Sequence, residues 1–524
     1  MAYRLIQWAL ANPVIVLLMG AALIAVGSYS FFHVNVEAYP DPAPAIIEVI
    51  AKYPGASAEE VERQVTIPLE VAMQGMPGLT YTRTKSLFGL SHMRNQFDYG
   101  YDYLRCRQEV INRLQFVEGL PDAVAPSLSP TSPTGEIMRY TLSSPKDAAG
   151  RDLYALNDLK ALQDWVIERE LRRVPRIIDV VSSGGTVKRY EVHPNPEQLL
   201  NYGITLDQLQ NAITKSNANV GGNYLFEGEN VINVRSIGLI GFGQDPARSM
   251  EVLNAATPED AAEYLRSEAD RRLKRIRQTV ITAHNNLPIR VENVIEGGSL
   301  RYSDDIGVHG VVVGHQPRLG QVGLSTPKLD ANGRIETTSD GKTIWQDERE
   351  RVQGIVLLRK GEASLPALHD LEAKLKELNE GTGKLLPGVQ IDPYYDRTDL
   401  INVTTETVHE NLLVGMGLVS LILLMFVSNV RSAIIVALNI PLALLFAFAV
   451  LFMRGKSANL LSIGAVDFGI IVDSSVIIVE NIYRHLSSGE YSDLPLKDRI
   501  LRASKEVERS LFFTTAIMVC AFLP

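Results

Sequence analysis

Three carboxylates interrupt an apolar stretch that otherwise has the composition of a membrane span. The stretch is DFGIIVDSSVIIVEN, and its acids are Asp467, Asp473 and Glu480. An ionised carboxylate near the centre of a bilayer costs about 3 kcal/mol or more, so acids at that depth usually serve ion or proton pathways. Desolvation also raises a carboxyl pKa, which suits a group that gains and loses a proton near neutral pH. The sequence therefore predicts a proton relay on this segment.

The spacing of the acids separates their roles. On a helix, Asp473 and Glu480 are seven residues apart and lie within about 20° of one face, whereas Asp467 lies about 120° away. Asp473 is expected near mid-membrane and is the strongest relay candidate. Glu480 could instead be an interfacial carboxylate paired with Arg484 four residues later. Asp467 could instead form a hydrogen bond between helices.

Further apolar segments are long enough to cross the hydrocarbon layer of about 30 Å. Residues 5–32 contain no charged residue and predict an uncleaved first span, in which Asn12-Pro13 is tolerated near one end. Four more spans are expected at residues 411–430, 432–453, 458–483 and 510–524, the last one incomplete. Because basic residues favour the cytoplasmic side, the charged segment 484–509 is predicted to be cytoplasmic and the long polar region to lie outside.

The polar region between the first two spans predicts repeated strand–helix–strand units. Ser57 and Glu60 have the spacing of a capping box at the start of a helix. Residues 155–174 form an amphipathic pattern, residues 178–194 read as two strands about a Gly-Gly turn, and residues 354–397 read as strand, helix and strand. Packed α+β subdomains are expected, with one large α/β domain as the alternative.

Residues 241–351 follow a looser pattern. Thr-Pro-Glu-Asp at residue 257 opens a strongly charged helix, for which solvent exposure is the default expectation. The dipeptides Asn-Gly and Asp-Gly within residues 327–350 predict a β-hairpin or a loop.

Composition excludes several classes of function. The net charge of −9 is spread without a basic run, which argues against nucleic acid as a partner. Two cysteines, Cys106 and Cys520, provide neither a disulfide framework nor a CxxC metal site, and both are expected to be buried and inert. No P-loop, nucleophile elbow or HExxH motif is present, so an enzyme is disfavoured and so is ATP as the energy source.

The acidic motif resembles the DFGxxxDGAxxxxEN signature of heavy-metal-efflux pumps of the resistance-nodulation-division (RND) superfamily, the CzcA/CusA type. Further stretches resemble landmarks of this family in the same order, at residues 39–79, 217–240, 388–401 and 509–524. Asp467, Asp473 and Glu480 stand at the three acidic positions of the family.

The resemblance implies an α-helical membrane bundle with a large periplasmic α+β region, truncated in its fifth transmembrane helix. The implied parts are a first transmembrane helix (1–32), porter subdomain 1 with the first part of porter subdomain 2 (33–183), a docking subdomain with insertions (184–350), the remainder of porter subdomain 2 (351–399) and transmembrane helices 2–5 (400–524).

The resemblance also implies the N-terminal half of an inner-membrane proton antiporter. Such a pump exports heavy-metal cations as a homotrimer, together with a periplasmic adaptor and an outer-membrane channel, and needs no cofactor. Its metal ligands are expected mainly in a second half that this chain lacks, and Met73 with Met76 is expected to be helix core.

Two departures from the family pattern and two alternatives remain. Ser474-Ser475 replaces the usual Gly-Ala, and its hydroxyls could bond the carboxylate or carbonyls four residues earlier. The region 241–351 is longer than the corresponding region of the family, so the contacts of its docking subdomain are expected to differ. The alternatives are an exporter of drugs or other organic solutes from the same superfamily, and a half-subunit or fragment that does not transport.

Overall fold

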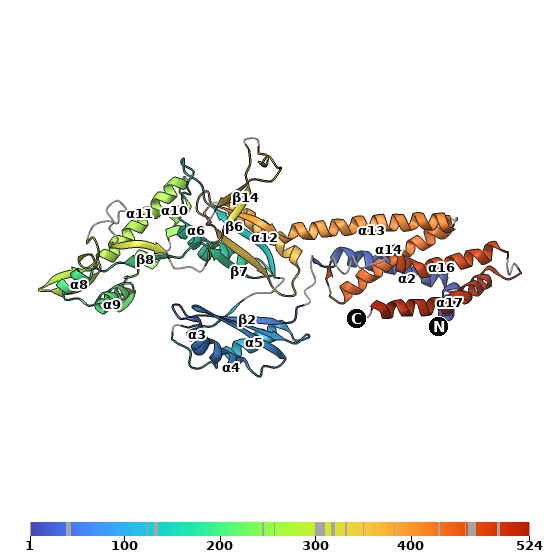
Figure 1. Ribbon diagram of the computed structural model, residues 1–524, viewed down its shortest axis with the longest axis horizontal. Coiled ribbons are helices and arrows are strands. Elements are labelled where there is room, and N and C mark those ends of the chain that lie inside the picture. The colour runs from blue at the N-terminus through green and yellow to red at the C-terminus, as the bar shows by residue number, and fades with distance from the viewer. Residues whose placement is uncertain are drawn as a thin grey trace. The chain divides into compact units, whose positions relative to one another are not determined.

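The chain forms two compact units in the computed structural model (Figure 1). One unit comprises Met1–Pro44, Ala363–Pro366 and Arg397–Pro524, and the other comprises Ala45–Glu362 and Ala367–Asp396. The structure describes residues 2–522 except 38–42, 123, 130–134, 244–245, 256, 299–309, 316–319, 331–332, 349, 382, 428–429, 456, 460–467 and 490–492.

The first sheet of the larger unit has the order β3-β4-β2-β5, and all its neighbours are antiparallel. Its strands are Leu79–Leu87 (β3), Leu90–Phe97 (β4), Ile46–Lys52 (β2) and Ser127–Ser129 (β5). Helix residues pack on it from α3 (Ala58–Val61), the π turn η1 (Glu62–Thr66), α4 (Ile67–Met73) and α5 (Tyr103–Leu114).

Local signals in this first part are confirmed. The Ser57 N–H donates to Glu60 Oε2 at 2.8 Å, and the Glu60 N–H donates to Ser57 Oγ at 3.3 Å, so the capping box is present. Met73 and Met76 are buried in the core between helix and sheet, as expected. Cys106 lies in the same core, where burial raises the pKa of its thiol.

The second sheet has the order β17-β6-β16-β7 and is also antiparallel. Its strands are Gln390–Asp396 (β17), Glu136–Ser143 (β6), Val352–Leu358 (β16) and Ile177–Gly184 (β7). Its helices are α6 (Leu156–Leu162), the π turn η2 (Gln163–Ile167), α7 (Glu168–Arg172) and α12 (Ser364–Glu380). The predicted helix at 155–174 and the strand–helix–strand unit at 354–397 are thus confirmed.

The chain between β7 and β16 builds a further core. Strand β8 (Lys188–Val192) pairs with β13 (Val311–His315), and residues of α9 (Leu206–Ser216), α11 (Pro258–Arg277) and β12 (Leu287–Arg290) pack beside them. The smaller elements here are α8 (Pro196–Asn201), η3 (Ile240–Gly243), η4 (Pro246–Arg248), α10 (Met250–Leu253), β11 (Val280–His284) and η5 (Val291–Asn293).

Three predictions in this part meet different outcomes. The two strands about Gly184-Gly185 exist, but β7 pairs with β16 and β8 with β13. The helix that begins after Thr257 exists, yet it is only half solvent-exposed, because Ala261, Leu265 and Ile276 are buried. The expected hairpin is formed by β14 (Leu324–Pro327) and β15 (Trp345–Glu348). A second hairpin, β9 (Val220–Glu227) with β10 (Asn230–Ser236), is exposed at every residue.

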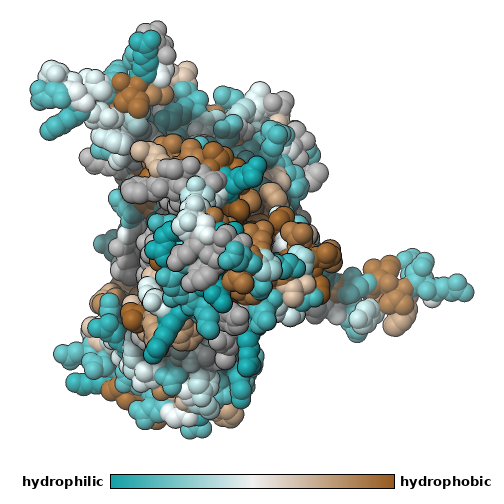
Figure 2. Space-filling view, turned by 90° about the vertical axis from the view of Figure 1, so that its right-hand side faces the viewer, coloured by the Kyte–Doolittle hydropathy of each residue, from teal (hydrophilic) through white to brown (hydrophobic). Residues whose placement is uncertain are grey.

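The smaller unit is built from long helices. These are α1 (Ala2–Ala11), α2 (Pro13–His33), α13 (Arg397–Val427), α14 (Val430–Met453), α16 (Phe468–Ser487) and α17 (Leu496–Phe522). Among the described residues, α2 and α14 are long and apolar enough to cross a bilayer. Their outer faces expose large apolar side chains such as Leu17 and Ile435. Figure 2 looks onto the right-hand end of the view in Figure 1 and shows hydrophobic residues beside polar ones.

Several expectations about the spans are corrected. The first helix is broken at Asn12, whose ψ of 59° is not helical, so α2 begins at Pro13. Ala458 and Asn459 do not begin a span; they form a short strand, β18, parallel to β1 (Val36–Glu37), because their backbone groups bond to the chain that leaves α2. Cys520 is exposed rather than buried, because it lies on an α17 face that no described residue covers.

Candidate functional site

The candidate site is built on helix α16. Asp473 lies in this helix, so its backbone is helical, but its side chain lies outside the described set; Asp467 lies outside the described residues altogether. Glu480 follows two turns after Asp473 on nearly the same face, as the spacing predicts. The structure therefore places two of the three acids on one helix.

Helix α14 packs against the middle of α16. Val476 and Val479 contact a cluster of buried residues on α14, which are Ala433, Val436 and Ile440. Asn439 Nδ2 donates a hydrogen bond of 3.0 Å to Ser475 Oγ. Two turns of α16 that follow Asp473 are thus held by both apolar and polar contacts.

The two serines after Asp473 bond between helices. Ser475 Oγ accepts from Asn439 of α14, and Ser474 Oγ lies 3.4 Å from Thr515 Oγ1 of α17. The hydroxyls that replace Gly-Ala therefore join α16 to its two neighbours.

Glu480 does not form the ion pair that was the alternative to a relay role. Its side chain is exposed and bonds to no other described residue. Arg484, the expected partner, instead points to Glu506 of α17, with Nη2 3.3 Å from Glu506 Oε1. Within the described part of the chain, the Glu480 carboxylate therefore lies on an exposed face of α16.

Glu506 gathers three donors from the last turns of α16. His485 Nε2 lies 2.6 Å from Glu506 Oε2, Asn481 Nδ2 donates to the same oxygen at 3.2 Å, and Arg484 contacts Oε1. These donors, His485 first, hold the pKa of Glu506 below its usual range. Sequence reasoning missed Glu506, because segment 484–509 mixes five acids with six Lys and Arg residues and no local pattern singles this acid out.

The end of α16 is held by α17 in a second way. Arg499 Nη2 donates to the carbonyls of His485 at 3.2 Å and Leu486 at 3.3 Å, and Asn481 Nδ2 also donates to Ala503 O at 2.7 Å. A cation at the last carbonyls of a helix satisfies their free acceptors and complements the helix dipole. The C-terminal end of the acid-bearing helix is thus fixed to α17.

The chain before α16 is tied to the start of α12. Strand β18 pairs with β1, whose Glu37 accepts bonds from the Ser364 N–H at 2.8 Å and from Ser364 Oγ at 2.5 Å. Ser364 is fully buried and is the first residue of α12. A carboxylate at a helix N-terminus is favourable because free N–H groups and the helix dipole meet it there.

No resident metal centre is found in the described part of the chain. No group of three His, Cys, Asp or Glu side chains there could hold a metal ion. The described contacts fix the helix that carries Asp473 and Glu480 to its neighbours α14 and α17.

A sequence model of the AcrB/AcrD/AcrF family matches residues 5–245 and 331–524. The unmatched residues between them fall within the range 241–351, in which the sequence follows a looser pattern. The match includes all three acids of the DFGIIVDSSVIIVEN motif.

Curated relatives match almost the whole chain. The chain is 33% identical over 532 residues to the cation efflux system protein CzcA of an Alcaligenes species. The aligned residues cover 99% of this chain and 44% of that protein. The cobalt-zinc-cadmium resistance protein CzcA of Cupriavidus metallidurans gives the same values, and the cation efflux system protein CusA of Escherichia coli K12 is 29% identical. The chain therefore spans less than half the length of these relatives.

A solved structure shares the fold. The crystal structure of a heavy metal efflux pump superposes on this chain with a TM-score of 0.73 and 32% sequence identity. The match covers 99% of this chain and 44% of the pump chain.

Proposed function

The chain belongs to the AcrB/AcrD/AcrF family, and from this premise we propose that it forms the N-terminal part of a proton-driven exporter of heavy-metal cations. The observation that carries the proposal is the pair Asp473 and Glu480 on the apolar helix α16, because carboxylates within such a helix are costly and usually mark an ion or proton pathway. The relatives are named for cation efflux or metal resistance, which favours metal ions over organic solutes as the exported substrate.

In this proposal Asp473 is the central proton carrier, and Asp467 and Glu480 pass protons to and from it. A protonated acid is neutral and tolerates apolar surroundings, whereas the ionised form needs a partner or water. Each cycle of proton uptake and release thus changes what α16 must contact. The basic partner of the acids is expected outside this chain.

In this proposal, movement of α16 would reach the polar region through β18, a strand that comes earlier in the chain than α16. Strand β18 is bonded to β1, and Glu37 of β1 binds the first residue of α12, Ser364. Helix α12 continues from Ser364 into the larger unit, where its residues Leu371 and Leu378 are buried. Protonation of α16 would be coupled by this path to porter subdomains assigned to residues 33–183 and 351–399.

The proposal includes the location and the partners of the protein. Residues 33–410 would lie in the periplasm and residues 484–509 in the cytoplasm, with the helices of the smaller unit in the inner membrane. The working pump would be a homotrimer that contacts a periplasmic adaptor and an outer-membrane channel, with docking contacts assigned to residues 184–350. Energy would come from the proton gradient, without ATP or a resident cofactor.

The test is resistance of a metal-sensitive strain that expresses the complete reading frame. We expect resistance to one or more of zinc, cobalt, cadmium, copper and silver, and we expect Asp473→Asn to reduce it to the level of the empty vector. The control is Asp493→Asn, the same change at an exposed acid in the loop after α16, which should keep full resistance.

Other results would redirect the proposal. Resistance to organic toxicants but not to metals would favour the organic-solute exporter. No resistance of any kind from a well-expressed wild type would favour a half-subunit that does not transport. Full metal resistance in Asp473→Asn would remove the relay from the proposal.

A further inference from the structure

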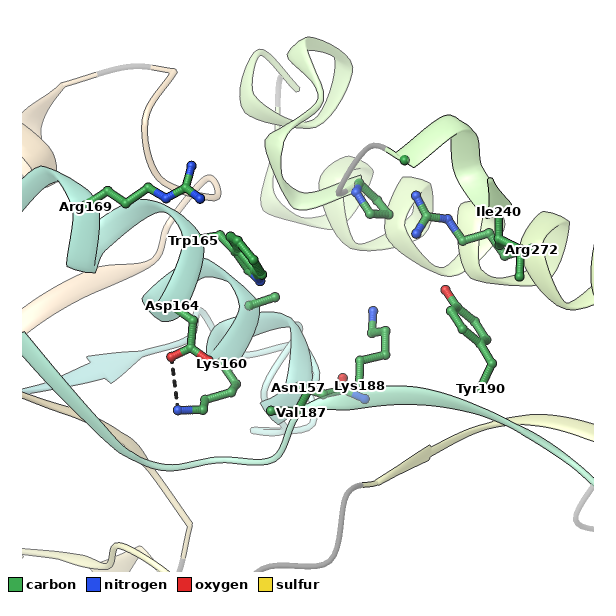
Figure 3. Close-up of a pocket in the computed structure, with 13 residues that line it drawn as sticks. Asn157, Lys160, Asp164, Trp165, Arg169, Val187, Lys188, Tyr190, Ile240 and Arg272 are labelled. Atoms are coloured by element: carbon green, nitrogen blue, oxygen red, sulfur yellow. Dashed lines mark ion pairs between the residues drawn. The ribbon is translucent and has the colours of Figure 1, made fainter. Parts of the chain in front are cut away.

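A basic cavity of about 460 Å³ lies in the larger unit, far along the chain from the acidic motif. It opens between the helix of α6, η2 and α7, the strand β8, and the η3–η4 segment with α11 (Figure 3). One acidic side chain, Asp164, lines it together with four cationic side chains, which are Lys160, Arg169, Lys188 and Arg272. An excess of positive charge at a concave site favours anions.

Neighbouring acids hold three of these four cations in place and offset part of their charge, whereas Arg169 has no acidic partner among the described residues. Lys160 Nζ lies 3.0 Å from Asp164 Oδ1, and Lys188 is paired with Asp158. Arg272 Nε lies 3.6 Å from Glu268 Oε1, and only 12% of the Arg272 side chain is exposed. Side chains that are already fixed lose little conformational entropy when a ligand binds, so these cations are preorganised.

The backbone beside Arg272 leaves room for its guanidinium group. Gly241 has a φ of +62°, and a Cβ there would lie 2.4 Å from Arg272 Nη2. Any other residue at position 241 would therefore displace Arg272 from the cavity wall as well as strain the backbone.

Aromatic and amide groups complete the wall. The Arg169 guanidinium lies over the Trp165 ring, 5.1 Å from its centroid, and Tyr190 rises from β8 beside Lys188 in Figure 3. Asn157 is only 4% exposed, and its Oδ1 has no hydrogen-bond partner in the described part of the chain. Because this oxygen only accepts hydrogen bonds, it needs a donor such as water or the hydroxyl group of a ligand, and the attraction for an oxyanion comes from the cations alone.

We propose that this cavity binds a small multivalent oxyanion, such as a di- or tricarboxylate, between Arg272, Arg169 and Lys188. Its volume is in the range of small-molecule pockets, and guanidinium groups bind carboxylate and phosphate oxygens with two parallel hydrogen bonds. The excess of cations disfavours a bare metal ion, so this site is separate from metal export and does not depend on the proposed function.

The test is isothermal titration calorimetry of the full chain in detergent at low ionic strength, with citrate and inorganic phosphate as probes. We expect saturable citrate binding whose affinity falls as NaCl is added. In Arg272→Gln the affinity for citrate should fall at least tenfold. The matched control is Arg271→Gln, because Arg271 also pairs with Glu268, at 3.0 Å, but does not line the cavity; its affinity should stay within twofold of the wild type.

Arg169→Gln provides a second variant if Arg272→Gln does not fold, since Arg169 is exposed and its loss should also weaken citrate binding at least threefold. Saturable phosphate binding with the same response to the variants would support the same oxyanion site. The proposal is overturned if neither probe binds the wild type, or if Arg271→Gln weakens binding as much as Arg272→Gln.

Discussion

At the scale of single residues, Glu506 is the side chain on which the end of α16 depends. Asn481, Arg484 and His485 all come from one turn of α16 and all contact this one carboxylate. Hydrogen bonds with an ionised partner are stronger than neutral ones, and a shared acceptor makes the three contacts interdependent. Loss of Glu506 should therefore weaken all three contacts together, while the Arg499 bonds to the carbonyls of His485 and Leu486 remain.

We predict that Glu506→Gln increases hydrogen exchange at the end of α16 at pH 7. Because the pKa of Glu506 is lowered in the folded protein, its stabilising contribution is present above the ordinary value of 4.5. That contribution is lost as the pH falls through the lowered value. The exchange rates of the wild type, corrected for intrinsic pH dependence, should then approach those of the variant at strongly acidic pH.

Asp493→Asn serves as the control for this measurement, because it removes one negative charge from the exposed loop between α16 and α17. It should leave exchange in α16 unchanged. Equal exchange in Glu506→Gln and the wild type at pH 7 would show that the carboxylate does not hold the helix end.

The residues of the candidate site were only partly accessible to sequence reasoning. The three acids could be named because their cost in an apolar helix is visible from residue type alone. Their surroundings could not, because Asn439, Thr515 and Glu506 come from other helices and no local pattern relates them to α16. The pairing of Glu480 with Arg484 was a local expectation that Glu506 overrode.

At the scale of elements, α2 and α14 approach each other at a glycine. A Cβ at Gly27 would lie 2.6 Å from Leu445 Cβ and 2.9 Å from the Leu445 carbonyl oxygen. Small residues allow helix backbones in membranes to pack closely, which compensates for the absence of a hydrophobic driving force between helices there. Gly27 therefore sets the distance between the two helices.

We predict that Gly27→Ala destabilises the helical unit by about 1–3 kcal/mol, because the methyl group must push Leu445 and its backbone away. Gly20→Ala on the same helix is the matched control, since no atom lies within 4 Å of its added Cβ. Thermal unfolding in detergent should show a lower midpoint for Gly27→Ala only. Equal midpoints for the two variants would contradict close packing at Gly27.

Elements that depend on neighbouring residues were predicted well, and elements that depend on distant partners were not. The Ser57 capping box and the helix after Thr257 follow from side chains within one turn. The pairing of β8 with β13, and of β18 with β1, joins segments more than 100 residues apart, so no periodic pattern could reveal it. The break at Asn12 arises where Pro13 removes a backbone donor.

At the scale of the whole molecule, the β9–β10 hairpin is a candidate surface for protein–protein contact. Every residue of both strands is exposed, including Phe226 at 78%, Leu225 at 59% and Tyr224 at 56%. A two-stranded hairpin is marginal by itself, and contiguous exposed apolar residues mark interaction surfaces. In the proposed homotrimer, a second copy of the chain would cover this hairpin.

We therefore predict that Phe226→Asp dissociates the trimer, because an aromatic hot-spot residue at an interface contributes about 2 kcal/mol or more, roughly a 30-fold change in affinity. Mass photometry of the detergent-solubilised protein should show trimers in the wild type and smaller species in the variant. Leu287→Asp is the control, since Leu287 is an equally exposed apolar residue outside the hairpin. An acid is not tolerated in a desolvated interface, so a trimer that persists in Phe226→Asp would show that the hairpin does not join the copies. Equal dissociation by Leu287→Asp would also contradict the prediction, because the effect would then not be specific to the hairpin.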